Sequence, residues 1–130
     1  MFERLTFTLG GIQRVEGRFR RVSGLKRTSP QLMEHLTAEM AELHEAVQSG
    51  NKQEIMCEVA DILILASEIA NAEGFSLRRA VQGKLHRNAD KYPPRALRTL
   101  QKQRGMTPQE AMDFAKNRWD RNKDQQYMRR

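Results

Sequence analysis

The amino-acid sequence predicts an all-α protein, a bundle of about four to six helices in a single domain over residues 1–130. Apolar side chains recur at spacings of three and four residues along most of the chain, which is the period of an α-helix. Two of these stretches begin with Ser or Thr followed by Pro, a signal typical of helix starts. Aromatic residues are only 6% of the chain and strand-like alternation is scarce, which disfavours a β-sheet protein. The length allows either a core within one chain or a core completed by oligomerisation.

The first helix is predicted from about Ile12 to Val22, where apolar residues recur at helical spacing. Gly10 and Gly11 precede it, and a glycine costs about 0.5–1 kcal/mol in a helix interior. Residues 6–9 could therefore either begin this helix or form a short extended piece. The basic residues that follow, up to Arg27, are expected to form a solvated linker.

Two long helices come next, joined by a short turn that contains a glycine. The first is predicted to start with Ser29 as its N-cap and Pro30 at its first position, and to end at about Gln48. The second is predicted from Lys52 to Glu73. Because the second is apolar nearly all round, we expect it to lie at the centre of the bundle.

Three shorter helical segments complete the chain. Residues 77–91 have an apolar face and end before a Pro-Pro pair, which cannot continue the helix. Residues 95–104 are predicted to form a short helix closed by Gly105. Thr107 begins a capping box that opens the last helix, and this helix is expected to fray beyond Asp124.

Four acidic side chains lie on or beside the apolar faces of the two long helices. They form two pairs with a spacing of three residues, Glu39 with Glu42 and Glu58 with Asp61, and residues at that spacing are neighbours on a helix. If the two helices pack antiparallel, the four carboxylates converge on one point. Unpaired carboxylates among apolar side chains are costly unless a cation neutralises them. Ligation by oxygen alone favours Mg²⁺, or Mn²⁺, over zinc.

Other readings of the acidic residues remain open. Acids at this spacing are common on exposed helices, where they are ordinary solvated charges. Glu45 and Glu68 extend the two acidic rows, so either of them could take the place of one ligand. The three histidines have no metal-ligand spacing relative to one another, and Cys57 is expected to be a packed small side chain.

The distribution of charge is uneven along the chain. Residues 31–74 carry nine acidic side chains and one basic one, whereas the net charge of the whole chain is +7. An acidic block between basic flanks suits a complex of a metal ion with a polyanion. The alternative is that the basic flanks bind nucleic acid or keep the protein soluble.

One helix has a basic face that suits the anionic part of such a complex. Lysine and arginine neutralise phosphate oxygens, an asparagine can hydrogen-bond a sugar or phosphate, and a tyrosine can stack on a base. An ordinary solvated basic face is the alternative. The residues of this face are Lys84, Arg87, Asn88 and Lys91, and Tyr92 follows directly after them.

The order of these motifs resembles the MazG-like nucleotide pyrophosphohydrolases of the all-α NTP pyrophosphatase superfamily. In this sequence the motifs read Glu39-Met-Ala-Glu42, fifteen intervening residues, Glu58-Val-Ala-Asp61, and then Lys84 through Asn88 to Lys91-Tyr92-Pro93. The resemblance covers about residues 30–93. Residues 1–29 and a basic C-terminal helical extension, residues 94–130, lie outside it.

The resemblance implies a MazG-like helical bundle whose active site forms in a homodimer or homotetramer. It implies Mg²⁺-dependent cleavage of a nucleoside triphosphate or deoxynucleoside triphosphate between the α and β phosphates, giving a monophosphate and pyrophosphate. The metal ligands and catalytic residues would be Glu39, Glu42, Glu58 and Asp61, one of which could orient or deprotonate the attacking water. The residues that bind the substrate would be Lys84, Arg87, Asn88, Lys91 and Tyr92.

Other activities are also compatible with these motifs. A dUTP/dCTP-specific enzyme and a phosphoribosyl-ATP pyrophosphohydrolase are alternatives within the class. A non-catalytic basic helical nucleic-acid-binding protein is the alternative of another class, and the acidic block argues against it.

The single cysteine excludes an internal disulfide framework, and no apolar run is long enough for a signal peptide or a membrane span. A cytoplasmic protein without a membrane partner is therefore expected.

Overall fold

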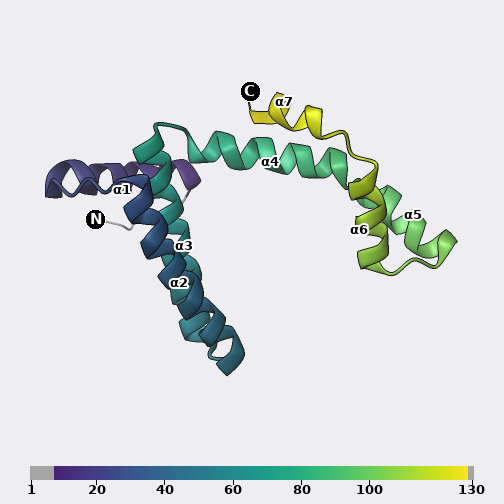
Figure 1. The fold of residues 1–130 in the computed structure, drawn as a ribbon, viewed down its shortest axis with the longest axis horizontal. Helices are drawn as coiled ribbons and strands as arrows, with labels where there is room; N and C mark the ends of the chain where they lie inside the picture. The colour runs from purple at the N-terminus through teal and green to yellow at the C-terminus, as the bar shows by residue number, and fades with distance from the viewer. Residues whose placement is uncertain (1–7, 129–130) are drawn as a thin grey trace. The chain divides into compact units, whose positions relative to one another are not determined.

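The computed structural model describes residues 8–128, and within them every regular element is helical. The prediction of an all-α fold is therefore confirmed (Figure 1). The chain divides after Arg78 into two compact units. The prediction that the whole chain is one domain stays a prediction. The elements are α1 (Leu9–Ser23), α2 (Ser29–Ser49), α3 (Lys52–Glu73), α4 (Leu77–Lys91), α5 (Pro94–Arg104), α6 (Pro108–Asn117), the 3₁₀ turn η1 (Arg121–Lys123) and α7 (Asp124–Met128).

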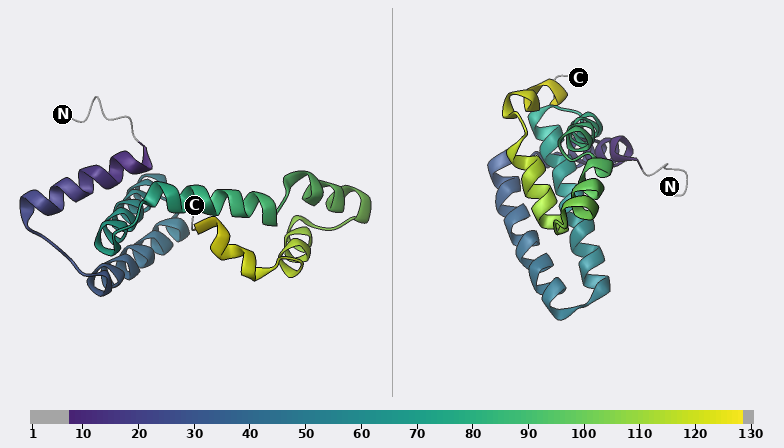
Figure 2. Two further views of the ribbon diagram at one scale, coloured as in Figure 1. Left: turned by 90° about the horizontal axis from the view of Figure 1, so that it is seen from above. Right: turned by 90° about the vertical axis from the view of Figure 1, so that its right-hand side faces the viewer.

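The first unit is organised around the hairpin of α2 and α3, which run side by side along most of their length (Figures 1 and 2). The turn between them is tight because Gly50 adopts a left-handed backbone conformation with φ of 72°. The next residue, Asn51, caps α3 by accepting hydrogen bonds from the backbone N–H groups of Gln53 and Glu54. These local signals fix the hairpin and set the register of the two acidic pairs.

The start of α2 corrects one prediction. The N-cap is Thr28 and not Ser29, so α2 begins one residue earlier than the sequence pattern predicted. Thr28 and Gln31 form a reciprocal capping box, in which the backbone N–H of Thr28 donates to Gln31 Oε1 over 2.9 Å. The box fixes this start because it satisfies two backbone donors at once, whereas the Ser-Pro pair that follows is already helical.

Helix α1 is attached to α3 by a set of polar side chains. Gln13 Nε2 donates to Asn71 Oδ1 over 3.1 Å, and Asn71 Nδ2 donates back to the Gln13 carbonyl over 3.0 Å. Asn71 also donates to Glu16, which is buried. Leu9 already belongs to α1, while residues 6 and 7 of the open segment lie outside the described part of the chain.

The first unit buries few large apolar side chains, although α3 packs against both α1 and α2 as its expected central place requires. The buried apolar residues of its helical hairpin are Leu32, Ala46, Leu65 and Ala70. Cys57 is also exposed, although it was expected to be packed. In the first unit the main neighbours of α3 among the described helices are α1 and α2, and several of its large apolar side chains are exposed. The exposed large apolar residues of the hairpin are Met33, Met40, Val47, Met56, Val59, Leu63 and Ile64.

The second unit contains most of α4 and the elements that follow it. The predicted capping box of Thr107 and Glu110 is confirmed at the start of α6. The last helix, however, ends at Asn117 and does not continue to Asp124. Asp120 has an extended backbone and its side chain accepts from the N–H of Asn122, which starts the short turn η1 in place of a further helical turn. Among the described residues no helix combines the length and apolarity that a bilayer span requires.

Candidate metal centre

The α2–α3 hairpin brings acidic residues from both helices to one place. Glu39, Glu58 and Asp61 each offer a carboxylate oxygen, and the three oxygens lie within 4.8 Å of one another. Glu42 is outside this group, yet its charge acts on Glu58. The convergence follows from the antiparallel pairing of two helices that each carry acids three residues apart.

The acids are less buried than the sequence pattern predicted. Glu39 and Glu58 are half-buried, whereas Glu42 and Asp61 are exposed. They are exposed because the side of the hairpin that carries them is not packed against a third helix in the described part of this unit. The cluster therefore lies at the edge of the hairpin.

Glu58 has the most crowded surroundings of the four acids. A hydrogen bond with Glu39 raises the pKa of Glu58, and desolvation and the charges of Glu42, Glu39 and Asp61 raise it further. One of its oxygens, Oε2, is buried and has no hydrogen-bond partner among the described residues. Like charges and an unsatisfied buried oxygen are what a divalent cation would relieve. The donor set, which is oxygen only, fits Mg²⁺ or Mn²⁺.

Glu68 and Glu45 are placed differently from these acids. Glu68 forms an ion pair with Arg27, whose Nη2 lies 2.7 Å from both of its carboxylate oxygens. Glu45 is exposed on α2. Neither belongs to the group of oxygens that could share a cation among the described residues.

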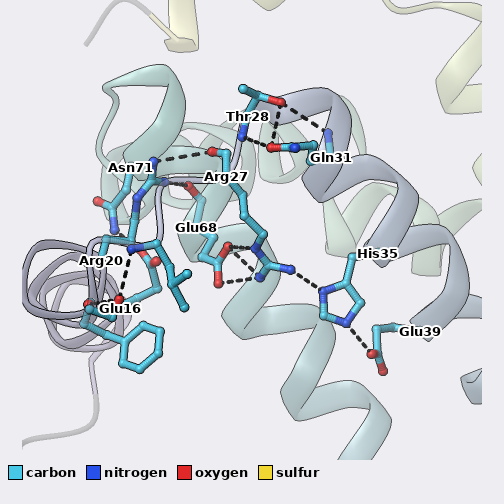
Figure 3. Close-up of polar contacts among 12 residues, drawn as sticks. Glu16, Arg20, Arg27, Thr28, Gln31, His35, Glu39, Glu68 and Asn71 are labelled. Atoms are coloured by element: carbon cyan, nitrogen blue, oxygen red, sulfur yellow. Dashed lines mark hydrogen bonds and ion pairs between the residues drawn. The ribbon is translucent and has the colours of Figure 1, made fainter.

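His35 is a neighbour of the cluster that the sequence analysis missed. Its Nε2 lies 2.8 Å from Glu39 Oε1, and its Nδ1 lies 2.7 Å from Arg27 Nη1 (Figure 3). The spacing of four residues between His35 and Glu39 on one helix was the available signal. The contact with Arg27 had no such signal, because Arg27 precedes the helix.

The predicted basic face lies on α4 in the second unit. Arg87 is half-buried and already engaged there, because its Nε donates to Asp124 Oδ1 over 2.7 Å and its Nη2 to Asp124 Oδ2 over 3.0 Å. Hydrogen bonds from Arg87 and from the Trp119 indole hold the pKa of Asp124 well below its usual range. Lys91 Nζ lies 5.3 Å from the centre of the Tyr92 ring.

Two more residues of the basic face, Lys84 and Asn88, are exposed on α4. Asn88 accepts a hydrogen bond from Arg87 Nη1 over 3.2 Å. The pairing of Arg87 with Asp124 was not predictable from sequence spacing, because the two residues are 37 positions apart.

Comparison with known proteins gives one match. The family model described as the MazG nucleotide pyrophosphohydrolase domain matches residues 27–96, which is more than half of the 130-residue chain. No curated protein and no solved structure matches the chain. The matched segment includes both acidic pairs, His35, Arg27 and the basic face of α4.

Proposed function

The chain belongs to the MazG nucleotide pyrophosphohydrolase family, and we propose that it is a Mg²⁺-dependent nucleoside triphosphate pyrophosphohydrolase. The family makes it a hydrolase that acts on phosphoanhydride bonds of nucleotides. The specific reaction proposed is cleavage of an NTP or dNTP between the α and β phosphates, giving a monophosphate and pyrophosphate.

The observation that carries this proposal is the convergence of Glu39, Glu58 and Asp61 on one small volume. With Glu42 as a fourth acid nearby, these residues would hold the cation by their carboxylate oxygens. The buried unpaired Oε2 of Glu58 supports the fit, because an unsatisfied oxygen is costly without a partner.

The chemistry follows from these groups. When bound, Mg²⁺ supplies charge stabilisation at the phosphate oxygens and lowers the pKa of a water ligand. One of the clustered carboxylates orients the attacking water and accepts its proton. The water oxygen bonds to phosphorus while the α–β bridging P–O bond breaks, and the electron pair of that bond stays on the leaving oxygen.

We assign the substrate-binding role to the basic face of α4 and to Tyr92, which follows this helix. Lys84, Lys91 and Arg87 would neutralise the phosphates, while Asn88 and Tyr92 would contact sugar or base. Lys84 and Asn88 are exposed and available for this role. Arg87 would have to exchange its partner Asp124 for a phosphate.

We also propose that the protein works as a homodimer or homotetramer. The exposed apolar side chains of the hairpin support this, since an apolar stripe of this kind marks a partner surface. A cytoplasmic setting is part of the proposal, because a single exposed cysteine fits a reducing compartment.

A panel of nucleotides with Mg²⁺, with pyrophosphate as the readout, tests this function. We expect pyrophosphate release from at least one NTP or dNTP and none when Mg²⁺ is replaced by a chelator. Preference for dUTP or dCTP, or turnover of phosphoribosyl-ATP alone, would assign one of the narrower activities. Absence of pyrophosphate across the whole panel would contradict the proposal and favour a non-catalytic protein.

A further inference from the structure

A line of hydrogen bonds connects Arg27 to the acidic cluster through His35 (Figure 3). We propose that His35 and Arg27 are positioning residues for Glu39, which hold its carboxylate towards the cation that it would share with Glu58 and Asp61. The inference rests on the proposed function, because it concerns the same metal centre. It adds two residues that neither the acidic motif nor the basic face includes.

The two contacts of His35 allow only one placement of its hydrogen. The guanidinium of Arg27 can only donate, so Nδ1 of His35 accepts and carries no hydrogen. The hydrogen of the neutral ring is then on Nε2, from which it donates to Glu39 Oε1. His35 is therefore a fixed donor that faces the carboxylate and not a ligand of the cation.

Arg27 is itself anchored from the other helix of the hairpin. Its Nε and Nη2 donate to the carboxylate of Glu68 on α3, at distances of 2.7 to 3.1 Å. The Glu68 side chain is only 13% exposed, which limits its freedom. Arg20 Nη1 also donates to the Glu68 carbonyl over 3.0 Å. Contacts therefore connect Glu68 on α3, through Arg27, to His35 and Glu39 on α2. Glu39 in turn lies beside the acids of α3 in the cluster.

This support matters because Glu39 lies among like charges. One of its oxygens lies within 4.8 Å of oxygens of Glu58 and Asp61, and the charge of Glu42 also acts on Glu58. Repulsion would turn an unsupported carboxylate towards water, whereas the N–H of His35 fixes one of its oxygens. In metal sites the loss of such a supporting partner typically weakens metal binding about 10–100-fold.

A purely structural role is the competing explanation. The Arg27–Glu68 ion pair would then only attach the segment before α2 to α3, and His35 would be incidental. The two explanations differ in what they predict for metal affinity when a donor is retained at position 35.

Calorimetric titration of the full chain with Mn²⁺ alone, without nucleotide, separates the two. His35→Leu removes the donor at similar size, and we expect its Mn²⁺ dissociation constant to rise about 10–100-fold. His35→Gln keeps an N–H that can donate to Glu39, and we expect an affinity within a few-fold of wild type. His44→Leu is the matched control, an exposed histidine on the same helix, and we expect no change.

Equal affinity of His35→Leu and wild type would overturn the inference, as would equal losses in His35→Leu and His35→Gln.

If His35→Leu lost its helical circular dichroism, Arg27→Lys would decide instead. Lysine keeps the charge opposite Glu68 but lacks the planar fork that reaches both partners. We therefore expect several-fold weaker Mn²⁺ binding, and unchanged binding would overturn the inference. A wild type that binds Mn²⁺ but hydrolyses no nucleotide contradicts the proposed function alone, since these comparisons still decide the roles of His35 and Arg27.

Discussion

Glu58 combines a half-buried position with three neighbouring acids. In the proposed site a bound cation would stabilise Glu58 in particular, because its buried Oε2 has no hydrogen-bond partner among the described residues. The Glu58→Gln substitution keeps the shape of the side chain but removes one negative ligand. We expect turnover to fall by about 100-fold or more, because charge stabilisation at the phosphates depends on the bound cation.

The helical circular dichroism of Glu58→Gln should match that of wild type, because removing a charge from a repulsive cluster does not disturb the fold. Glu45→Gln serves as the control, since Glu45 is an exposed acid on α2 outside the cluster. A Glu58→Gln variant with near wild-type turnover would show that the ligand assignment is wrong.

Glu16 provides a second prediction, which concerns pH. Desolvation by burial is the main cause that raises the pKa of Glu16 above its ordinary value of 4.5. The folded state therefore holds a proton more tightly than the unfolded state, and stability falls as the pH rises from about 4.5 through the raised pKa. Thermal or urea unfolding of Glu16→Gln should show a weaker pH dependence in this window.

At pH 7 Glu16→Gln should be more stable than wild type by about 1 kcal/mol, because a neutral amide replaces a buried charge with an unpaired oxygen. Its carbonyl can still accept from Asn71. A variant less stable than wild type at pH 7 would contradict this prediction. It would mean that the charges of Arg20 and Arg27 stabilise the Glu16 carboxylate by more than its burial destabilises it.

Among the helices, local signals in the sequence were sufficient to predict the hairpin that carries the candidate metal centre. The bounds of α3 and α4 agree with the predicted bounds, because Gly74 and the Pro-Pro pair mark helix ends unambiguously. The end of α6 was not predicted, because the Asp120 side chain competes for the backbone there. The acidic pairs were found by their spacing on two helices.

The contacts that His35 and Arg27 make beside the acids were not predicted, and the reason is physical. Helix periodicity identifies neighbours on one helix, so the contact of His35 with Glu39 was within reach of the sequence. The contact of Arg27 with Glu68 joins residues 41 positions apart and depends on how the linker before α2 folds back. The burial of the acids was overestimated, because periodicity gives the direction of a face and not what covers it.

The turn of the hairpin carries a prediction about the element as a whole. Gly50 has a φ of 72°, a conformation that costs an L-residue about 1–2 kcal/mol. Gly50→Ala should therefore reduce the free energy of unfolding by about that amount, as measured by urea denaturation. Gly10→Ala is the control: Gly10 lies in α1 and an added Cβ meets only ordinary contact there, so stability should stay equal or rise. Equal effects of both substitutions would contradict the role of the turn.

At the scale of the whole molecule, the uncovered apolar stripe of α3 is the feature to explain. Met56, Val59 and Leu63 are exposed at helical spacing. If a second copy covers them, Val59→Lys should dissociate the protein, as observed by light scattering after size-exclusion chromatography. Gln53→Lys adds the same charge at an exposed polar position of α3 and should leave the mass unchanged. A monomeric wild type would contradict the proposed dimer or tetramer.

The proposed function requires that this chain hydrolyses nucleoside triphosphates at the α–β bond through its acidic cluster. The most direct test is a ³¹P NMR spectrum of the reaction with Mg²⁺ and the best substrate of the nucleotide panel, recorded for wild type and for Glu58→Gln. We expect nucleoside monophosphate and pyrophosphate in equal amounts with wild type, and an almost unchanged triphosphate with the variant. Nucleoside diphosphate and orthophosphate as products, or equal turnover by both proteins, would contradict it.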